Sequence, residues 1–120
     1  MKKIIDVSLI IPLKNDYNIF KELYFYILDQ EVLPKELIIV DTTIGGNIEK
    51  LKNLKELNNE INIKYINKIN CYPGKARNVG VQYSVSNYLA FLDVKTFPPK
   101  NWLANYYKLL INSKKKVIFG

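Results

Sequence analysis

The stretch Val7-Ser8-Leu9-Ile10-Ile11-Pro12 decides the fold of this 120-residue chain. It is short, almost wholly aliphatic and rich in β-branched residues, a pattern typical of a strand buried on both faces of a parallel sheet. Two later runs share this character: Leu37-Ile38-Ile39-Val40, which ends at Asp41, and Tyr88-Leu89-Ala90-Phe91-Leu92, which ends at Asp93. The three runs predict the buried centre of one parallel sheet.

Segments with helical spacing of their apolar residues separate these strands. The first, residues 16–30, has Asp16 or Asn18 as its predicted N-cap, and Pro34 lies beyond its end. Further helices are predicted at residues 47–57, 73–84 and 101–111, and further strands at 61–66 and 117–119. The alternation of strands and helices predicts an α/β fold of three layers, with helices on both faces of a mostly parallel sheet.

The length and composition exclude several classes of protein. A chain of 120 residues with 48% apolar content predicts a single globular domain, residues 1–120. The absence of His excludes a Ser-His-Asp triad and imidazole metal ligands, and the single Cys71 excludes an internal disulfide. No run of about 18 apolar residues is present, so no transmembrane helix is predicted. Together these features suit a reducing cytoplasm.

The charge of the chain is distributed unevenly. Residues 1–60 carry a formal net charge of −2, whereas residues 61–120 carry +9, with Arg77 as the only arginine of the chain and Asp93 as the only acid of that half. A basic half can indicate nucleic-acid binding. Lys, Ile and Asn make up 47 of the 120 residues, however. Compositional drift is therefore the favoured explanation, and nucleic acid is not the favoured partner.

Three segments follow the predicted buried strands and are the places to look for a site. In parallel α/β sheets, ligands bind outside the carboxyl ends of the strands, where the strand order reverses. This rule selects residues 13–16, 41–46 and 93–96. At one of these ends, the carboxylate of Asp41 can accept hydrogen bonds from a ligand, or it can instead cap the turn that follows the strand.

The segment Tyr72-Pro73-Gly74-Lys75-Ala76-Arg77-Asn78-Val79-Gly80 is predicted to open a helix. Pro73 suits the first helical position, and the free N–H groups of a helix start form a ready anion site. Lys75 and Arg77 place positive charge at the end of the helix dipole where cations are unfavourable. A bound phosphate would explain them, since the guanidinium of Arg77 offers two parallel donors. An exposed basic helix start without a ligand is the alternative.

Asp93 and Lys95 follow the last of the three buried strands. A single carboxylate is a weak metal site, although Mg²⁺ can be held by one or two carboxylates together with the phosphates of a ligand. If the strand continues, Lys95 points to the same side as Asp93, close to any diphosphate. A simple ion pair between the two side chains is the alternative.

Four segments, in order, resemble family 2 inverting glycosyltransferases, which have the Rossmann-like GT-A fold. Val7–Asn15 resembles the opening strand V-S-I-I-I-P-x-Y-N, and Leu37–Asp41 resembles the second strand with the first acid of V-D-D-G-S. Gly74–Gly80 is similar to G-x-x-A-R-N-x-G, and Tyr88–Leu103 resembles Y-I-A-F-L-D-x-D-D-x-x-x-P-x-W-L. Each segment alone is weak, but together they are specific for the nucleotide-sugar-binding half of the fold.

The resemblance implies roles for seven of the nine residues of the predicted site. Family members bind a nucleoside-diphosphate sugar, often a uridine one, at the strand ends, so a UDP-sugar is the favoured partner. The implied ligands are Pro12, Leu13 and Asn15 beside the base, Asp41 on the base, Arg77 and Asn78 near the ribose and diphosphate, and Asp93 near the ribose and the metal. The positions of Lys75 at the helix start and of Lys95 after the strand add these two lysines, near the diphosphate, to the predicted site. Asp93 would also be the first acid of the family's D-x-D motif and a metal ligand.

Three departures from the family pattern concern this site. Thr42 stands where the second acid of V-D-D-G-S is expected, and Lys95 replaces the acid that usually ligates Mn²⁺ or Mg²⁺. Lys95 weakens the case for either metal and can itself neutralise a diphosphate, so a degenerate D-x-D motif with metal-independent donor binding is one expectation. No residue from Thr96 to Gly120 is acidic, so the catalytic base is unidentified and expected beyond Gly120.

The sequence therefore predicts the donor-binding half of a family 2 glycosyltransferase, incomplete at its C-terminus and inactive alone, with an unknown acceptor. A degenerate, non-catalytic interaction module on the same scaffold is the alternative. A receiver domain is disfavoured, because no Asp follows the third predicted strand. We expect a cytoplasmic location, with peripheral membrane attachment as a second location, and self-association through an exposed sheet edge.

Overall fold

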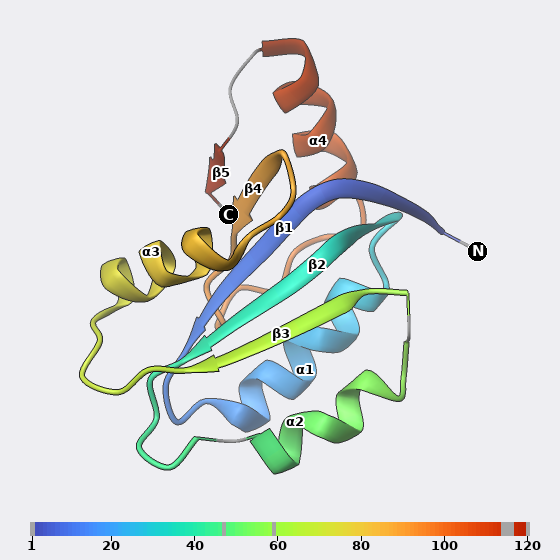
Figure 1. Ribbon diagram of the computed structural model, residues 1–120. Helices are drawn as coiled ribbons and strands as arrows, with labels where there is room; N and C mark the ends of the chain where they lie inside the picture. The colour runs from blue at the N-terminus through green and yellow to red at the C-terminus, as the bar shows by residue number, and fades with distance from the viewer. Residues whose placement is uncertain (1, 47, 59, 114–116, 120) are drawn as a thin grey trace.

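The computed structural model describes residues 2–46, 48–58, 60–113 and 117–119, in which strands and helices alternate (Figure 1). The strands are β1 (Lys3–Leu13), β2 (Val32–Asp41), β3 (Asn62–Asn67), β4 (Tyr88–Phe91) and β5 (Val117–Phe119). The helices are α1 (Tyr17–Leu28), α2 (Ile48–Lys55), α3 (Pro73–Tyr83) and α4 (Trp102–Ser113). The predicted order of elements is confirmed, with boundaries that differ by a few residues.

The five strands form one parallel sheet in the order β3-β2-β1-β4-β5. The chain proceeds outward from β1 through β2 to β3, and then returns to the other side of β1 for β4 and β5. The strand order therefore reverses between β1 and β4. At such a point the connections diverge above and below the sheet, and the carboxyl ends of the strands are left accessible to a ligand. The predicted α/β fold class is confirmed.

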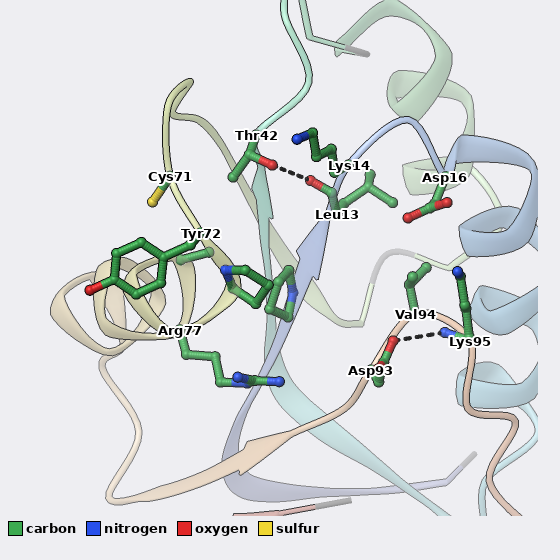
Figure 2. Close-up of a pocket in the computed structure, with 13 residues that line it drawn as sticks. Leu13, Lys14, Asp16, Thr42, Cys71, Tyr72, Arg77, Asp93, Val94 and Lys95 are labelled. Atoms are coloured by element: carbon green, nitrogen blue, oxygen red, sulfur yellow. Dashed lines mark hydrogen bonds between the residues drawn. The ribbon is translucent and has the colours of Figure 1, made fainter.

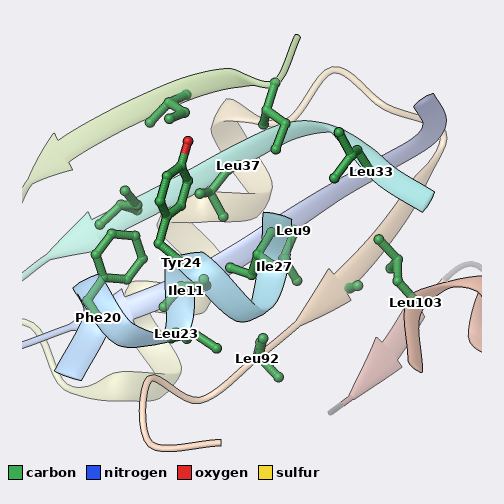
Figure 3. Close-up of a cluster of buried hydrophobic side chains, with 14 of the residues drawn as sticks. Leu9, Ile11, Phe20, Leu23, Tyr24, Ile27, Leu33, Leu37, Leu92 and Leu103 are labelled. Carbon is green, nitrogen blue, oxygen red and sulfur yellow. The ribbon is translucent and has the colours of Figure 1, made fainter. Parts of the chain in front are cut away.

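Helices cover both faces of the sheet, as predicted, but unequally. Helices α1, α2 and α4 contribute to the larger core, in which Phe20 and Leu23 of α1 lie with Leu9 and Ile11 of β1 (Figure 3). Among the described residues, α3 is the one helix that covers the opposite face (Figure 1). Its smaller core consists of Ala76 and Val79 of α3 with Ile10, Ile38, Val40 and Phe91 of the strands. A single helix thus closes the face that borders the switch point.

Helix α3 lies very close to β1 at Gly80. A Cβ atom built on Gly80 would come within 2.4 Å of Ile10 Cγ2, a distance that real Cβ atoms essentially never show. Any larger residue would push the helix away from the sheet. The last glycine of the G-x-x-A-R-N-x-G segment therefore has a packing role, and it sets the depth of α3 one turn after Arg77.

Pro34 lies inside β2, whereas the aliphatic run in the sequence predicts a strand only from Leu37. It pairs with Ile5 of β1, and the register of the two strands shifts between Ile5 and Ser8. Because proline has no N–H to give to a strand ladder, strands tolerate it at such irregularities. The shift lets β2 continue through a residue that sequence rules treat as a boundary.

Glu36 is a fully buried acid in β2. Its carboxylate accepts hydrogen bonds from Ser8 Oγ (2.5 Å) and from the Val85 N–H (2.7 Å), and Lys64 Nζ lies 2.7 Å from Oε1. Lys64 also donates to the Tyr83 carbonyl. Burial by itself would raise the pKa of Glu36, but Lys64, Ser8 and the Val85 N–H together hold the pKa below its ordinary value. This Glu36 cluster joins three strands to the end of α3.

Candidate functional site

A cleft of about 390 Å³ lies at the carboxyl ends of β1, β2 and β4, beside the start of α3 (Figure 2). The three segments selected from the sequence and the predicted helix start all contribute to it. The lining residues are Pro12, Leu13, Lys14 and Asp16 after β1, Thr42 after β2, Cys71, Tyr72, Pro73, Ala76 and Arg77 around the start of α3, and Asp93, Val94 and Lys95 after β4.

Thr42 lines the cleft and links the ends of β2 and β1. Its N–H and its hydroxyl both donate to the Leu13 carbonyl, at 2.7 and 3.3 Å. The next residue is tied in the same way, since the Asn15 N–H donates to Thr43 Oγ1 at 2.7 Å. Asn15 adopts a left-handed backbone (φ 55°), a conformation that Asn tolerates better than most residues. Thr42, which replaces the family's second acid, and the following Thr43 therefore join the ends of the two strands. Asn15 lies outside the cleft lining.

Asp41 is fully buried at the end of β2 and does not line the cleft. Its carboxylate accepts hydrogen bonds from the Thr43 N–H (2.9 Å) and from the Tyr65 hydroxyl (2.5 Å). The Asn67 amide donates to its carbonyl at 2.8 Å. Of the two readings made from the sequence, the contacts of Asp41 match capping of the turn. A role of Asp41 in binding a base stays a prediction.

Helix α3 begins at Pro73, as predicted, and turns one side toward the cleft. Ala76 is buried there and Arg77 is half-buried, one turn after Pro73. Lys75 and Asn78 are exposed and lie outside the cleft lining. The helical repeat of 3.6 residues explains this division, because positions 73, 76 and 77 share a side that positions 75 and 78 do not.

The segment after β4 is a turn and not a continued strand. Strand β4 ends at Phe91, and the Asp93 carboxylate accepts the Lys95 N–H at 3.1 Å while the Asp93 carbonyl accepts the Thr96 N–H at 2.9 Å. The strand does not continue to Lys95, so the condition under which Lys95 was expected on the side of Asp93 is not met. Both residues nevertheless line the cleft, since the turn brings Lys95 there (Figure 2). The hydrogen bond between them is donated by the Lys95 backbone N–H.

The charges of the cleft come from separate elements. Lys14, Arg77 and Lys95 supply three positive groups, and Asp16 and Asp93 supply two negative ones. Among the residues that the structure describes, no three His, Cys, Asp or Glu side chains gather so that they could hold a metal ion. The arrangement favours a polyanionic ligand over a bare cation.

Several lining residues were not among the nine predicted ligands. Lys14 and Asp16 lie within the segment selected after β1, so the strand-end rule could have named them. Cys71 and Tyr72 precede the predicted helix and are not among the predicted ligands. Their place at the cleft depends on the chain path from β3 to α3, which no local pattern reveals.

A family model for glycosyl transferase family 2 matches residues 8–120. The chain belongs to this family. Uncharacterized glycosyltransferases of Rickettsia felis and Rickettsia conorii are each 33% identical to this family 2 chain over 87 residues, 72% of its length. The matched part is 14% of each of those proteins. The chain thus spans about one seventh of the curated relatives it matches.

Solved structures of S. aureus TarS share the fold of this family 2 chain. The TarS 1–349 complex with UDP superposes with a TM-score of 0.71 at 25% identity, over 93% of this chain and 32% of that one. The complex with UDP-GlcNAc has a TM-score of 0.69 at 22% identity over the same shares. The GT-A fold is therefore confirmed. None of the helices within the described residues has the length and apolar character to cross a membrane.

Proposed function

We propose that the cleft binds the diphosphate of a nucleoside-diphosphate sugar, and that the protein acts in glycosyl transfer to an acceptor. The observation that carries this proposal is the convergence of Lys14, Arg77 and Lys95, from three separate segments, on one cleft at the switch point of the sheet. Opposite charge and the N–H groups at the start of α3 favour phosphate oxygens at this place. Membership of family 2 supports the reaction class.

A uridine nucleotide is the proposed donor. The support comes from TarS, whose similar fold has been crystallised with UDP and with UDP-GlcNAc. In this proposal Pro12 and Leu13 border the base, Arg77 and Lys95 approach the diphosphate, and Asp93 lies on the ribose side. Asn15, Asp41, Lys75 and Asn78 are proposed to act from outside the cleft lining, by shaping its turns or its local charge.

The proposed reaction is direct displacement at the anomeric carbon. A base removes the proton of an acceptor hydroxyl, the oxygen attacks the anomeric carbon, and the bond to the diphosphate oxygen breaks. The cationic side chains of the cleft stabilise the negative charge that develops on the leaving diphosphate. We propose that the base and the acceptor site lie outside these 120 residues, which therefore form one donor-binding domain of a larger enzyme.

Calorimetric titration of the 120-residue chain with UDP tests this proposal, with uridine, UMP and ADP as comparison ligands. We expect binding that strengthens from uridine to UMP to UDP, because each phosphate adds charge-assisted contacts. UDP should bind more tightly than ADP if the site recognises the uracil base. Absence of UDP binding both with and without Mn²⁺ would refute the donor site.

A non-catalytic interaction module is the second candidate function. It is favoured by Asp41, whose carboxylate is already used by Thr43 and Tyr65, and by the loss of the family acids at Thr42 and Lys95. The same titration separates the candidates, since an eroded site should bind none of the nucleotides. Conversion of Lys95 to the family acid, Lys95→Asp, should then fail to restore UDP binding in Mn²⁺.

A further inference from the structure

The cleft carries one more positive group than negative groups, and its positive groups flank it on three sides. Lys14 follows β1, Arg77 projects from α3 on the side of the cleft that faces Asp93, and Lys95 follows β4 (Figure 2). Lys14 and Lys95 are exposed, so their ammonium groups can move toward a ligand without loss of packing. The two negative groups, Asp16 and Asp93, lie on different segments.

The side chains of the cleft do not fit a divalent cation. At nucleotide sites Mg²⁺ is usually held by one or two carboxylates together with phosphate oxygens and water. One oxygen of Asp93 already accepts the Lys95 N–H. The Lys95 side chain follows two residues later, where a metal site would need an acid. A dication placed here would therefore be repelled by three positive side chains, with Asp16 and Asp93 as the two acids of the lining.

The turn after β4 explains how a lysine comes to lie at this position. The Asp93 carboxylate accepts the Lys95 N–H, and the Asp93 carbonyl accepts the Thr96 N–H. Such a turn, closed by the side chain of its first residue, is a local structure that Asp and Asn both form. Asp93 therefore acts as a positioning residue, because its contact fixes the backbone that carries Lys95.

We propose that this site binds its nucleoside diphosphate without a divalent metal, with the Lys95 ammonium lying against the phosphates in place of the cation. This inference rests on the proposed function of the cleft and states how that site neutralises its ligand. Arg77 supplies a planar pair of donors from one side, and Lys95 supplies a compact, mobile charge from the other. Asp93 holds the turn and ligates no ion.

Calorimetric measurement of UDP binding in EDTA and in Mn²⁺, for the unchanged chain and for Lys95→Gln, tests this proposal. We expect dissociation constants that agree within about twofold in the two buffers, and a loss of about tenfold or more for Lys95→Gln, the usual effect of losing one charge-assisted contact. Lys108→Gln is the matched control, because Lys108 is exposed on α4 outside the cleft, and it should change the constant less than twofold.

A second pair of variants separates the turn from a metal role of Asp93. Asp93→Asn keeps an oxygen that can accept the Lys95 N–H, and should retain UDP binding in EDTA within about threefold. Asp93→Ala removes that acceptor and should weaken binding by more than Asp93→Asn does. Circular dichroism checks that each variant is folded.

Each outcome is decisive. Binding that appears only with Mn²⁺ overturns the metal-free site but leaves the proposed function intact. Binding in EDTA that Lys95→Gln does not weaken overturns the assignment to Lys95, and equal losses for Asp93→Asn and Asp93→Ala overturn the role of the turn. Absence of UDP binding in both buffers refutes this inference and the proposed function together.

Discussion

Two charged clusters in this small domain balance their charges in opposite ways. In the Glu36 cluster, one fully buried carboxylate is met by the Lys64 ammonium, by Ser8 and by the Val85 N–H. In the cleft, Lys14, Arg77 and Lys95 outnumber the two acids; the two lysines are exposed and Arg77 is half-buried. A buried charge must find its partners within the protein, whereas an open site can retain an excess that a ligand neutralises. The balance of charge thus distinguishes the Glu36 cluster, whose charges are paired within the protein, from the cleft, which has an excess of positive charge and for which we propose an anionic ligand.

The largest expected effect is on the Glu36 cluster. Glu36→Ala should lower the free energy of unfolding by about 2–4 kcal/mol, because it leaves buried donors without an acceptor and opens a cavity. Urea unfolding followed by circular dichroism measures the change. Glu22→Ala, which removes an exposed carboxylate on α1, should stay within about 0.5 kcal/mol. Similar losses of unfolding free energy for both variants would contradict a stabilising role of the Glu36 cluster.

A smaller effect is expected in the cleft, on binding and not on stability. Arg77→Ala should weaken UDP binding by about 1.5–3 kcal/mol, or roughly 10- to 100-fold, with little change in unfolding. Lys75→Ala on the same helix should lose less, because Lys75 lies outside the cleft lining. Calorimetry and urea unfolding of both variants measure the two effects. An equal loss of affinity for Lys75→Ala would favour the assignment made from the sequence alone.

The smallest expected effect is a pH dependence that belongs to one cluster. The pKa of Glu36 is held below its ordinary value of 4.5, so its contribution to stability is fully present above that value. The contribution is lost as the pH falls through the lower pKa of the folded state. Urea midpoints between pH 7 and pH 3 should therefore decline less steeply for Glu36→Gln than for the unchanged chain. Parallel declines would contradict the lowered pKa.

Local patterns predicted the frame of the molecule well. The aliphatic runs at Val7–Pro12 and Leu37–Val40 are central strands, and α3 starts at Pro73. These features follow from residue type and spacing, which act within a few residues of chain. The strand-end rule also located the cleft, because the carboxyl ends of parallel strands meet at one edge of the sheet.

Contacts between residues far apart in the sequence could not be predicted from local patterns. Gln30 is buried and binds the Pro99 carbonyl and the Leu103 N–H, so it joins the end of α1 to the start of α4. From the sequence, Pro34 is expected outside any strand. The register shift that lets β2 include it involves β1, a partner that the local sequence does not reveal. A ligand-binding role for Asp41 was likewise left open, because its partner Tyr65 lies on β3 and cannot be recognised from the sequence around Asp41.

The sequence by itself determined the alternating elements, the family and the edge of the sheet where a ligand would lie, because each depends on short patterns of apolar, turn-forming and charged residues. Only the tertiary structure decided which charges belong to the cleft. Asp41 is buried in contact with Tyr65, Lys75 lies outside the cleft lining, and Lys95 lines the cleft because of the turn after β4. The physical reason is that burial and charge balance depend on neighbours far apart in the chain, which no local pattern specifies.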